Sequence, residues 1–387
     1  MVIQRKELQM KKRLLSLLLS AGLLIGVALA VALGGSASDP LISLRYLEDT
    51  YQASLLQQVQ GKVNAKSDAV YQGALNHLKE AMISKGMVTR ETIGNANLYA
   101  DGFLEMRLKK GDTISGITGT SVFLLAGQVS VSFSKGAVIN VTVGKTVPSG
   151  TALAGWQRYL AGENTVPNFV VQSDTAVISV DGYYKLQKSN ATDYNQLAEA
   201  LYKMGLFKGK GLDYGSGYAL EDKANRIEGL IMFLRLLGKE KEALACQTPH
   251  PFTDVPAWCN GYVAYAYEKG YTNGVSETAF GTYREIGAKE YVTFLLRALG
   301  YQEETDGFQW STSLDKAKEL GVLTKGEHTM LSTTQFTRAQ MVYVSYYGLS
   351  AEEKAGGSLL NLLIEQGILS SRKAKSAMAT VTGTRIS

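Results

Sequence analysis

The chain has 387 residues, a length that suits two or three domains rather than one small core. Hydrophobic residues make up 45% of it and 40 residues are glycine, as in globular modules of which some are rich in turns. The formal net charge is +5, but residues 1–37 hold five basic residues against one acidic residue, so the remainder is close to neutral. The remainder has no basic stripe, which argues against a nucleic-acid-binding protein.

Residues 1–37 predict a targeting signal, because basic residues up to Arg13 precede an uncharged apolar run over 14–33 and then small residues. Gly35 and Ala37 suit the positions that a signal peptidase recognises, which favours cleavage after Ala37. The run would span roughly 30 Å as a helix, so an uncleaved membrane anchor is the alternative. Both interpretations place the rest of the chain outside the cytoplasm.

Residues 40–90 predict a helical hairpin or stalk. Apolar residues recur every three or four positions over 44–59, and a second periodic stretch covers 69–82. A break is expected near Gly61. The amphipathic pattern permits self-association without requiring it.

Residues 95–188 predict an all-β module, either a sandwich or a roll. Short runs of alternating β-formers are separated by turn signals, a pattern typical of compact all-β folds. The runs are 102–108, 121–125, 129–133, 138–143, 169–171 and 176–180, and the turn signals are 110–112, 134–136, 148–150 and 181–182. The module contains no His and no Cys, which excludes a cupin-type metal cluster. Its acidic residues lie mostly at turns and do not suggest paired catalytic carboxylates.

Residues 192–370 predict three helical repeats, over about 192–245, 250–302 and 308–370. Short apolar-periodic helices end at a glycine four times, and related sequences open a second helix three times. The glycines are Gly205, Gly270, Gly321 and Gly367, and the openings are Asn225–Glu228, Gly287–Glu290 and Thr337–Gln340. The openings have capping-box spacing, which predicts helix starts. Helical units that recur along the chain in this way predict stacked repeats, and they favour a binding or anchoring surface over catalysis.

Arg226 and Arg338 each follow the N-cap of such a second helix. Free backbone N–H groups at a helix start favour anions, and a guanidinium there can hold a carboxylate through two parallel hydrogen bonds. Both arginines are therefore candidate anion-binding residues. Solvent-exposed arginines without a ligand are the alternative.

The loop that opens the second repeat holds further candidates. Asp254 is expected to cap the following helix, and Trp258 is a candidate for stacking on a sugar ring or for holding the loop on the core. Cys246 and Cys259 flank the loop, and an exported protein can keep a disulfide between them. Two separate small apolar residues are the alternative, and no zinc site is expected.

Three segments resemble the S-layer homology repeat of bacterial surface proteins. They are Phe252-Thr-Asp-Val-Pro-Ala-Trp258, the stretch from Tyr262 to Gly274, and Phe336-Thr-Arg-Ala-Gln340. The resemblance covers about 193–369 and is strongest in the middle repeat. It implies a C-terminal all-α bundle of three repeats with pseudo-threefold symmetry, whose inter-repeat grooves hold an often acidic cell-wall polysaccharide.

The resemblance also implies roles for individual residues. Arg226 and Arg338 would act as the motif arginine, Asp254 and Trp258 as the opening motif, and Gly270 and Gly274 as the tight loop near the ligand. The chain departs from the family pattern at Ala288, which replaces the arginine, at Gln340, which replaces a glutamate, and in the first repeat, which lacks the opening motif. At most two of the inter-repeat grooves can therefore have the full set of motif residues.

The sequence thus predicts an exported, non-catalytic protein of a Gram-positive envelope with a multidomain α+β fold. Its partners would be a wall polysaccharide or peptidoglycan, with a membrane only if the targeting signal stays uncleaved; no cofactor or metal is expected. Residues 371–387 are expected to form a basic flexible tail. One alternative makes the repeats a degenerate structural bundle and the β module the ligand- or partner-binding part. A second alternative is a hydrolase that remodels the cell wall.

Overall fold

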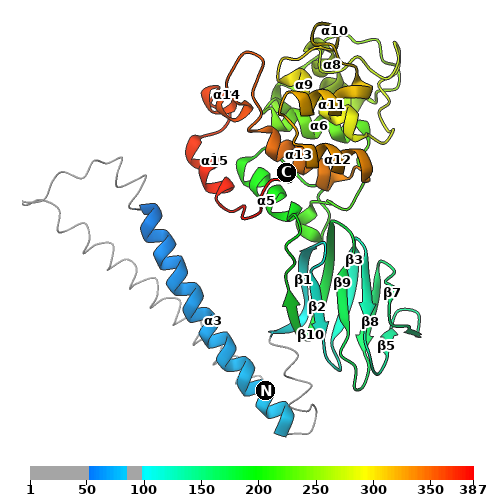
Figure 1. Cartoon of the computed structure of the whole chain (residues 1–387), viewed down its shortest axis with the longest axis vertical. Helices are drawn as coiled ribbons and strands as arrows, with labels where there is room; N and C mark the ends of the chain where they lie inside the picture. The colour runs from blue at the N-terminus through cyan, green and yellow to red at the C-terminus, as the bar shows by residue number, and fades with distance from the viewer. Residues whose placement is uncertain (1–51, 85–97) are drawn as a thin grey trace, which may run out of the picture. The chain divides into compact units, whose positions relative to one another are not determined.

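A computed structural model of the protein describes residues 52–84 and 98–387 (Figure 1). The chain divides into two compact units, Met1–His77 and Leu78–Ser387. The expected targeting signal of residues 1–37 lies outside the described residues. Within the described ranges, no helix combines the length and the apolar character needed to cross a membrane.

The helix α3 spans Gln52–Ser84 without interruption, so the hairpin with a break near Gly61 is wrong for these residues. Gly61 and Gly73 both lie inside the helix, each at a cost of about 1 kcal/mol relative to alanine. Alanine, glutamine, lysine and leucine dominate this segment, and their helix propensity carries the helix through both glycines.

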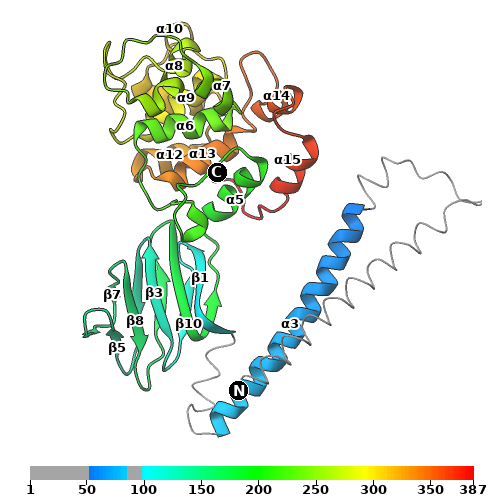
Figure 2. The same cartoon turned by 180° about the vertical axis from the view of Figure 1, so that it is seen from behind.

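The β module is a ten-stranded sheet whose pairs are all antiparallel. Its order is β6-β5-β8-β3-β10-β2-β9-β4-β7. Strand β1 pairs with the other edge of β10 and lies beside it in Figure 2. The strands are β1 (Leu98–Lys109), β2 (Thr113–Gly116), β3 (Ser121–Ala126), β4 (Val129–Ser132), β5 (Val138–Asn140), β6 (Lys145–Val147), β7 (Thr151–Ala152), β8 (Gln157–Ala161), β9 (Asn168–Val171) and β10 (Thr175–Gln187). The expected all-β module is therefore confirmed.

Strand β10 connects the two halves of this sheet. It pairs with β3 through residues 177–181 and with β2 through residues 184–187. Side chains from both halves, such as Val122 and Phe169, share one buried core. The sheet thus curves almost into a barrel around a single core.

The turn expected at 181–182 is wrong, because β10 continues through both residues. Gly182 has a φ of +92°, which glycine tolerates without a Cβ, and it pairs with Ala100. The register of β1 shifts between Ala100 and Leu104 opposite this point. The glycine therefore marks a bulge within a long strand rather than a chain reversal.

The helical part follows the β module. Its helices are α5 (Tyr194–Met204), α6 (Arg226–Leu236), α7 (Glu240–Ala245), α8 (Asn260–Glu268), α9 (Ala288–Ala298), α10 (Glu303–Asp306), α11 (Ser313–Glu319), α12 (Lys325–Thr333), α13 (Arg338–Gly348), α14 (Leu359–Glu365) and α15 (Ser371–Met378). Short 3-10 turns are η2 (Gly215–Gly217), η3 (Ala257–Cys259) and η4 (Trp310–Thr312). The glycines expected to end helices, Gly205, Gly270, Gly321 and Gly367, all have positive φ.

The second helices of the expected repeats, α6, α9 and α13, begin at the expected sites and each packs against the other two. Full capping boxes open α6 at Asn225 and α13 at Thr337. At Gly287 only half of the device forms, because glycine has no side chain and only Glu290 reaches back to its backbone N–H. Local sequence thus sets where these helices start.

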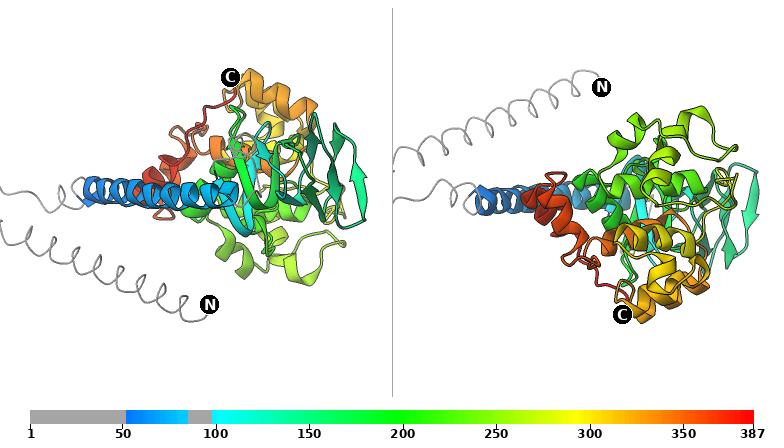
Figure 3. Two further views of the ribbon diagram at one scale, coloured as in Figure 1. Left: turned by 90° about the horizontal axis from the view of Figure 1, so that it is seen from below. Right: turned by 90° about the horizontal axis from the view of Figure 1, so that it is seen from above.

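The flexible tail expected for residues 371–387 is wrong. Helix α15 packs against α5 (Figures 1 and 3), and Arg385 forms two hydrogen bonds of 2.7 and 2.8 Å with the fully buried Glu327. The backbone N–H of Ile386 donates to the Tyr343 hydroxyl at 2.9 Å. The C-terminal residues are therefore a packed part of the helical core, although they lack apolar periodicity.

Arg107 on β1 joins the β module to the helical part. Its Nε donates to Asn195 at 2.8 Å, its Nη1 to the Gly215 carbonyl at 2.5 Å and its Nη2 to Glu221 at 2.9 Å. Only 10% of the Arg107 side chain and 7% of the Glu221 side chain are exposed. The β module and the helices belong to one compact unit, so the expected domain limits near 188–192 stay predictions.

Candidate functional site

A cavity of about 410 Å³ lies between the first and second predicted repeats and reaches the start of the third. We call it the inter-repeat cavity. Helix α6 supplies Arg226, the loop before α9 supplies residues 273–275 and Arg284, and α9 supplies Glu290 and Arg297. Glu303 and Trp310 complete its charged and aromatic lining.

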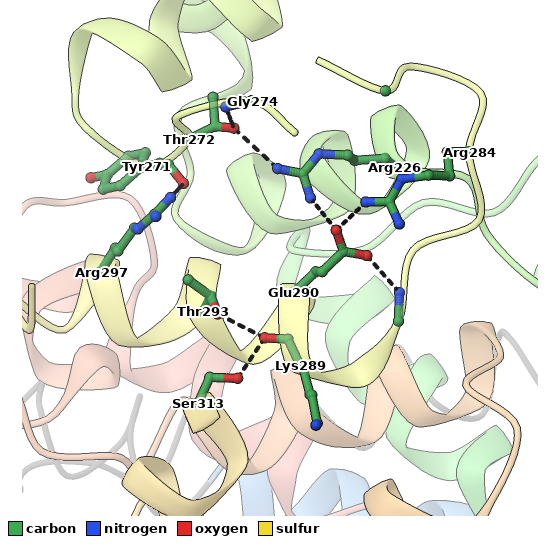
Figure 4. A network of polar contacts seen from close by, with 12 residues as sticks. Arg226, Tyr271, Thr272, Gly274, Arg284, Lys289, Glu290, Thr293, Arg297 and Ser313 are labelled. Carbon is green, nitrogen blue, oxygen red and sulfur yellow. Dashed lines mark hydrogen bonds and ion pairs between the residues drawn. The ribbon is translucent and has the colours of Figure 1, made fainter. Parts of the chain in front are cut away.

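Arg226 lines the inter-repeat cavity, is only 5% exposed and points toward Glu290 (Figure 4). Its Nη1 donates to Glu290 at 2.8 Å and its Nη2 to the Thr272 hydroxyl at 3.3 Å. Its guanidinium also lies over the rings of Phe280 and Phe294, 5.1 and 5.2 Å from their centroids. The Nε of Arg226 is buried and has no hydrogen-bond partner among the described residues.

Glu290 pairs with two arginines at once. It accepts hydrogen bonds from Arg226 and from Arg284, and its second oxygen accepts from the backbone N–H of Gly287 at 3.1 Å. The Arg284 side chain is 50% exposed, whereas that of Glu290 is only 12% exposed. Arg284 is therefore the cation of this cluster that a dissolved anion can reach.

A second ion pair lies on the far side of the cavity. Arg297 is bound to both oxygens of Glu303 and donates through Nη1 to the Tyr271 carbonyl at 2.9 Å. With Arg226 and Arg284, the cavity holds three arginines against two glutamates. The surplus of one positive charge favours an anionic ligand.

Burial lowers the pKa of Arg226 to about 10, although Glu290 acts in the opposite direction. Arg284 and Arg297 lower it further because like charges repel. The Arg226 guanidinium is therefore still protonated, and positively charged, at neutral pH. An anion that entered the cavity would relieve this repulsion.

The helix starts do not offer free N–H groups, contrary to the expectation from sequence. The N–H of Arg226 donates to the Arg284 carbonyl at 2.8 Å, and that of Ile227 donates to the Thr282 carbonyl at 3.2 Å. In the third repeat, the N–H of Arg338 donates to the Asp222 carbonyl at 2.8 Å. A loop of a neighbouring repeat therefore satisfies the donors that were expected to bind a ligand.

Arg338 does not line the inter-repeat cavity. It is 4% exposed, and its Nε and Nη2 donate to the carbonyls of Tyr218 and Lys208 at 3.2 and 3.4 Å. Its guanidinium lies 5.7 Å from the ring centroid of Phe207. Burial lowers the pKa of Arg338. The two motif arginines are thus both buried, and neither matches the solvent-exposed alternative.

Asp254 and Trp258 also lie outside the inter-repeat cavity. Asp254 does not cap the following helix but accepts from the backbone N–H groups of residues 280–282 at 2.7, 2.7 and 3.2 Å. Burial opposes ionisation of this carboxyl, but the three N–H groups hold its pKa below the ordinary value. Trp258 is 58% exposed, and its Nε1 lies 3.4 Å from the Tyr283 hydroxyl.

The two candidate glycines have different surroundings. Gly274 lines the cavity at a φ of +75°, and a Cβ there would lie 2.4 Å from the Phe252 ring and 2.6 Å from the Ala279 carbonyl oxygen. Gly270, at a φ of +70°, has open space around it and follows α8. Gly274 thus shapes the cavity, whereas Gly270 ends a helix.

The structure has Cys246 and Cys259 as free thiols and so lacks the disulfide that the sequence allowed. The Cys259 thiol is buried against the Pro256 carbonyl at 3.4 Å, and Cys246 lies 3.6 Å from Glu268. Burial raises the pKa of the Cys259 thiol to about 11, which makes it a poor nucleophile. Among residues 52–84 and 98–387, no cluster of three or more His, Cys, Asp or Glu could hold a metal ion.

Arg284, Arg297 and Trp310 were not predicted as site residues from the sequence. Arg284 and Arg297 stand outside the motif that drew attention to Arg226. Trp310 is 58% exposed and opens η4 directly before the first helix of the third repeat, much as Trp258 lies in η3 before α8. That shared position is the signal that could have identified Trp310.

Comparison with known proteins identifies cell-envelope relatives, although no family model matches the chain. The chain is 29% identical over 133 residues to the middle cell wall protein of Brevibacillus brevis, a match over 34% of this chain and 12% of that protein. It is 30% identical over 125 residues to the surface layer protein of Brevibacillus choshinensis, with coverages of 32% and 11%. It is 28% identical over 134 residues to the cell surface protein of Thermoanaerobacter kivui, with coverages of 34% and 17%.

The match thus spans less than a fifth of each of these relatives. Among solved structures, the coconut allergen cocosin is similar over 26% of this chain and 33% of that chain at 13% identity, but its TM-score of 0.15 supports no shared fold. The three relatives are named as a cell wall protein, a surface layer protein and a cell surface protein, and none of these names is that of an enzyme. The chain is accordingly a cell-surface protein, located at the cell wall or surface layer.

Proposed function

We propose that the helical part anchors the protein to the cell wall by binding an acidic wall polysaccharide in the inter-repeat cavity. The observation that carries this proposal is the convergence of three arginines and an exposed tryptophan on one cavity with a surplus positive charge. The mutual packing of α6, α9 and α13 supports a pseudo-threefold bundle of S-layer-homology type. The names of the relatives support a location where such a polymer is present.

Arg284 makes the principal contact in this mechanism. A sugar carboxylate takes the place of Glu290 beside its half-exposed guanidinium and forms charge-assisted hydrogen bonds. Arg226 and Arg297 stay in their buried pairs and supply the positive field. Trp310 covers the C–H face of the neighbouring sugar ring. Binding is an equilibrium process with no covalent step.

Arg226 and Gly274 shape the site, and Asp254 holds a neighbouring loop in place. Asp254 ties the loop over residues 280–282, which leads directly into Arg284. Arg338 performs a comparable packing role in the third repeat and makes no ligand contact. A single cavity of this kind among residues 52–84 and 98–387 predicts modest affinity, which neighbouring molecules on a surface would raise through avidity.

The test is retention of the full chain on purified cell walls. Arg284→Ala should reduce the affinity about tenfold or more, because a charge-assisted hydrogen bond contributes roughly 1.5–3 kcal/mol. Trp310→Ala should weaken binding similarly. The exposed Lys241 on α7 offers a matched control, and Lys241→Ala should bind as the parent does.

Chemical removal of acidic substituents from the wall should abolish retention of the parent protein. Retention that survives both this treatment and Arg284→Ala would contradict the proposal. It would favour the alternative in which the repeats are a structural bundle.

A further inference from the structure

The outer face of the β module carries a second cavity, of about 850 Å³, which wall anchoring does not use. Its floor is a row of side chains across four neighbouring strands. Glu105 pairs with Ser179, Ser179 with Phe123, and Phe123 with Arg158. Since side chains alternate along a strand, this row faces away from core residues such as Leu124. We call it the sheet-face cavity.

Two exposed aromatic side chains stand over this floor. Phe103 is 42% and Trp156 is 57% exposed, on a sheet face where polar residues would be expected. Both have positive φ, +25° and +59°, which costs a residue with a Cβ roughly 1–3 kcal/mol. The Trp156 ring packs edge-on against Phe123 and Tyr214, and the Phe103 ring lies against the Arg158 guanidinium. About half of each aromatic side chain is nevertheless exposed and therefore accessible to a ligand.

The helical part supplies the opposite wall. The N–H of Gly215 donates to Glu105 at 2.7 Å, and its carbonyl accepts from Arg107 at 2.5 Å. These bonds hold residues 211–214 beside the sheet, with the Tyr214 ring 5.2 Å from that of Trp156. The sheet-face cavity is therefore a property of the whole compact unit and not of the β module alone.

The charges of the sheet-face cavity differ from those of the inter-repeat cavity. Arg158 is its single cation, and its guanidinium lies 4.6 Å from the centre of the Phe103 ring. Glu105 and Asp213 give it two acidic groups. With a net charge of −1, it disfavours the acidic polymer that the inter-repeat cavity attracts.

We propose that the sheet-face cavity is a second glycan-binding site, specific for an uncharged saccharide of hexose or N-acetylhexosamine units. Trp156 and Phe103 cover the C–H faces of the sugar rings, and Arg158 and Asp213 hydrogen-bond to hydroxyl or acetamido groups. The row that forms the floor runs across the face of the sheet, over β1, β10, β3 and β8, so a ligand there meets side chains rather than the backbone of an unpaired strand edge. The site is independent of the proposed wall anchor.

The test is calorimetric titration of the full chain with three tetrasaccharides: tetraacetylchitotetraose and cellotetraose, which are uncharged, and tetragalacturonate, which is acidic. Trp156→Gly removes the ring and its contacts with Phe123 and Tyr214 but suits the positive φ, so the variant should still fold. It should bind the uncharged ligand about tenfold or more weakly. Tyr202→Ala, at a 54% exposed aromatic on α5, is the matched control and should bind normally.

A spectroscopic measurement reports on the site directly. With Trp258 and Trp310 replaced by phenylalanine, Trp156 is the single tryptophan, and its emission should shift to the blue as the uncharged saccharide covers the ring. Failure of the parent to bind either uncharged tetrasaccharide, or normal binding by Trp156→Gly, would overturn the proposal. So would Trp156-dependent binding of decaproline without saccharide binding.

The outcomes separate the two sites. Arg284→Ala should leave binding of the uncharged ligand unchanged and weaken that of tetragalacturonate. If only tetragalacturonate binds and its binding depends on Arg284, the wall anchor stands and the sheet-face site is refuted. The reverse pattern refutes the anchor alone.

Discussion

Replacing Glu290 by glutamine should destabilise the helical part far more than removing its exposed partner Arg284. The side chains of Glu290 and Arg226 are only 12% and 6% exposed, so the substitution leaves a buried guanidinium without its countercharge. Breaking a buried pair in this way costs roughly 3–5 kcal/mol. Glutamine can still accept from the Gly287 N–H, which places the expected loss at about 3 kcal/mol. Arg284→Ala breaks a pair whose arginine is 50% exposed and should cost at most about 1 kcal/mol.

Urea denaturation followed by circular dichroism measures both variants against the parent. The combination Arg226→Met with Glu290→Gln is the internal control, because removing the buried cation as well should recover most of the lost stability. Equal destabilisation by Glu290→Gln and Arg284→Ala would refute the reasoning. It would mean that Glu290 acts mainly through the exposed arginine.

Three further predictions concern the C-terminal residues, the glycines and pH. Arg385→Ala leaves the fully buried Glu327 without its cation and should lower the free energy of unfolding by about 3 kcal/mol, measured by urea denaturation; no change would mean that the last residues do not stabilise the fold. Gly274→Ala should cost roughly 2–4 kcal/mol because its Cβ meets backbone at 2.6 Å, whereas Gly270→Ala should cost about 1 kcal/mol, and equal thermal shifts would contradict this contrast. Burial opposes ionisation of Glu240, but hydrogen bonds from Arg235 and Lys208 lower its pKa to about 2. The stability that this carboxylate contributes is therefore present above pH 4.5 and lost as the pH falls toward 2. Glu240→Gln should reduce the change in the free energy of unfolding between these pH values by at most about 1 kcal/mol.

Much of the fold follows from local chemistry that a sequence displays. Asparagine or threonine at an N-cap and glycine at a helix end act within a few residues, and α6 and α13 begin where such signals lie. Alternation of β-forming residues is also a local signal, and it predicted the β module. The error at 181–182 arose because an Asp-Gly pair suits both a turn and a bulge, and only the partner strand β1 decides between them.

Long-range partners explain what the sequence did not reveal. The C-terminal residues lack apolar periodicity, yet Arg385 is held by Glu327, 58 positions away. The inter-repeat cavity combines Arg226 with Arg284 and Trp310, which share no motif. The sheet-face cavity depends on strand register, which composition does not encode. Sites of this kind become visible only when the packing of distant segments is known.

The motif arginine itself has a structural explanation that applies in both repeats where it occurs. Each of Arg226 and Arg338 lies at the first position of a second helix, donates its backbone N–H to a loop of a neighbouring repeat, and buries its guanidinium against aromatic rings. Ala288 holds the equivalent position in α9 and is also buried, without a cation. The motif arginine, which suggested ligand binding from the sequence, thus stabilises the contact between repeats. Anion recognition then depends on where an exposed arginine such as Arg284 is added beside that contact, and among these three helix starts this occurs at Arg226.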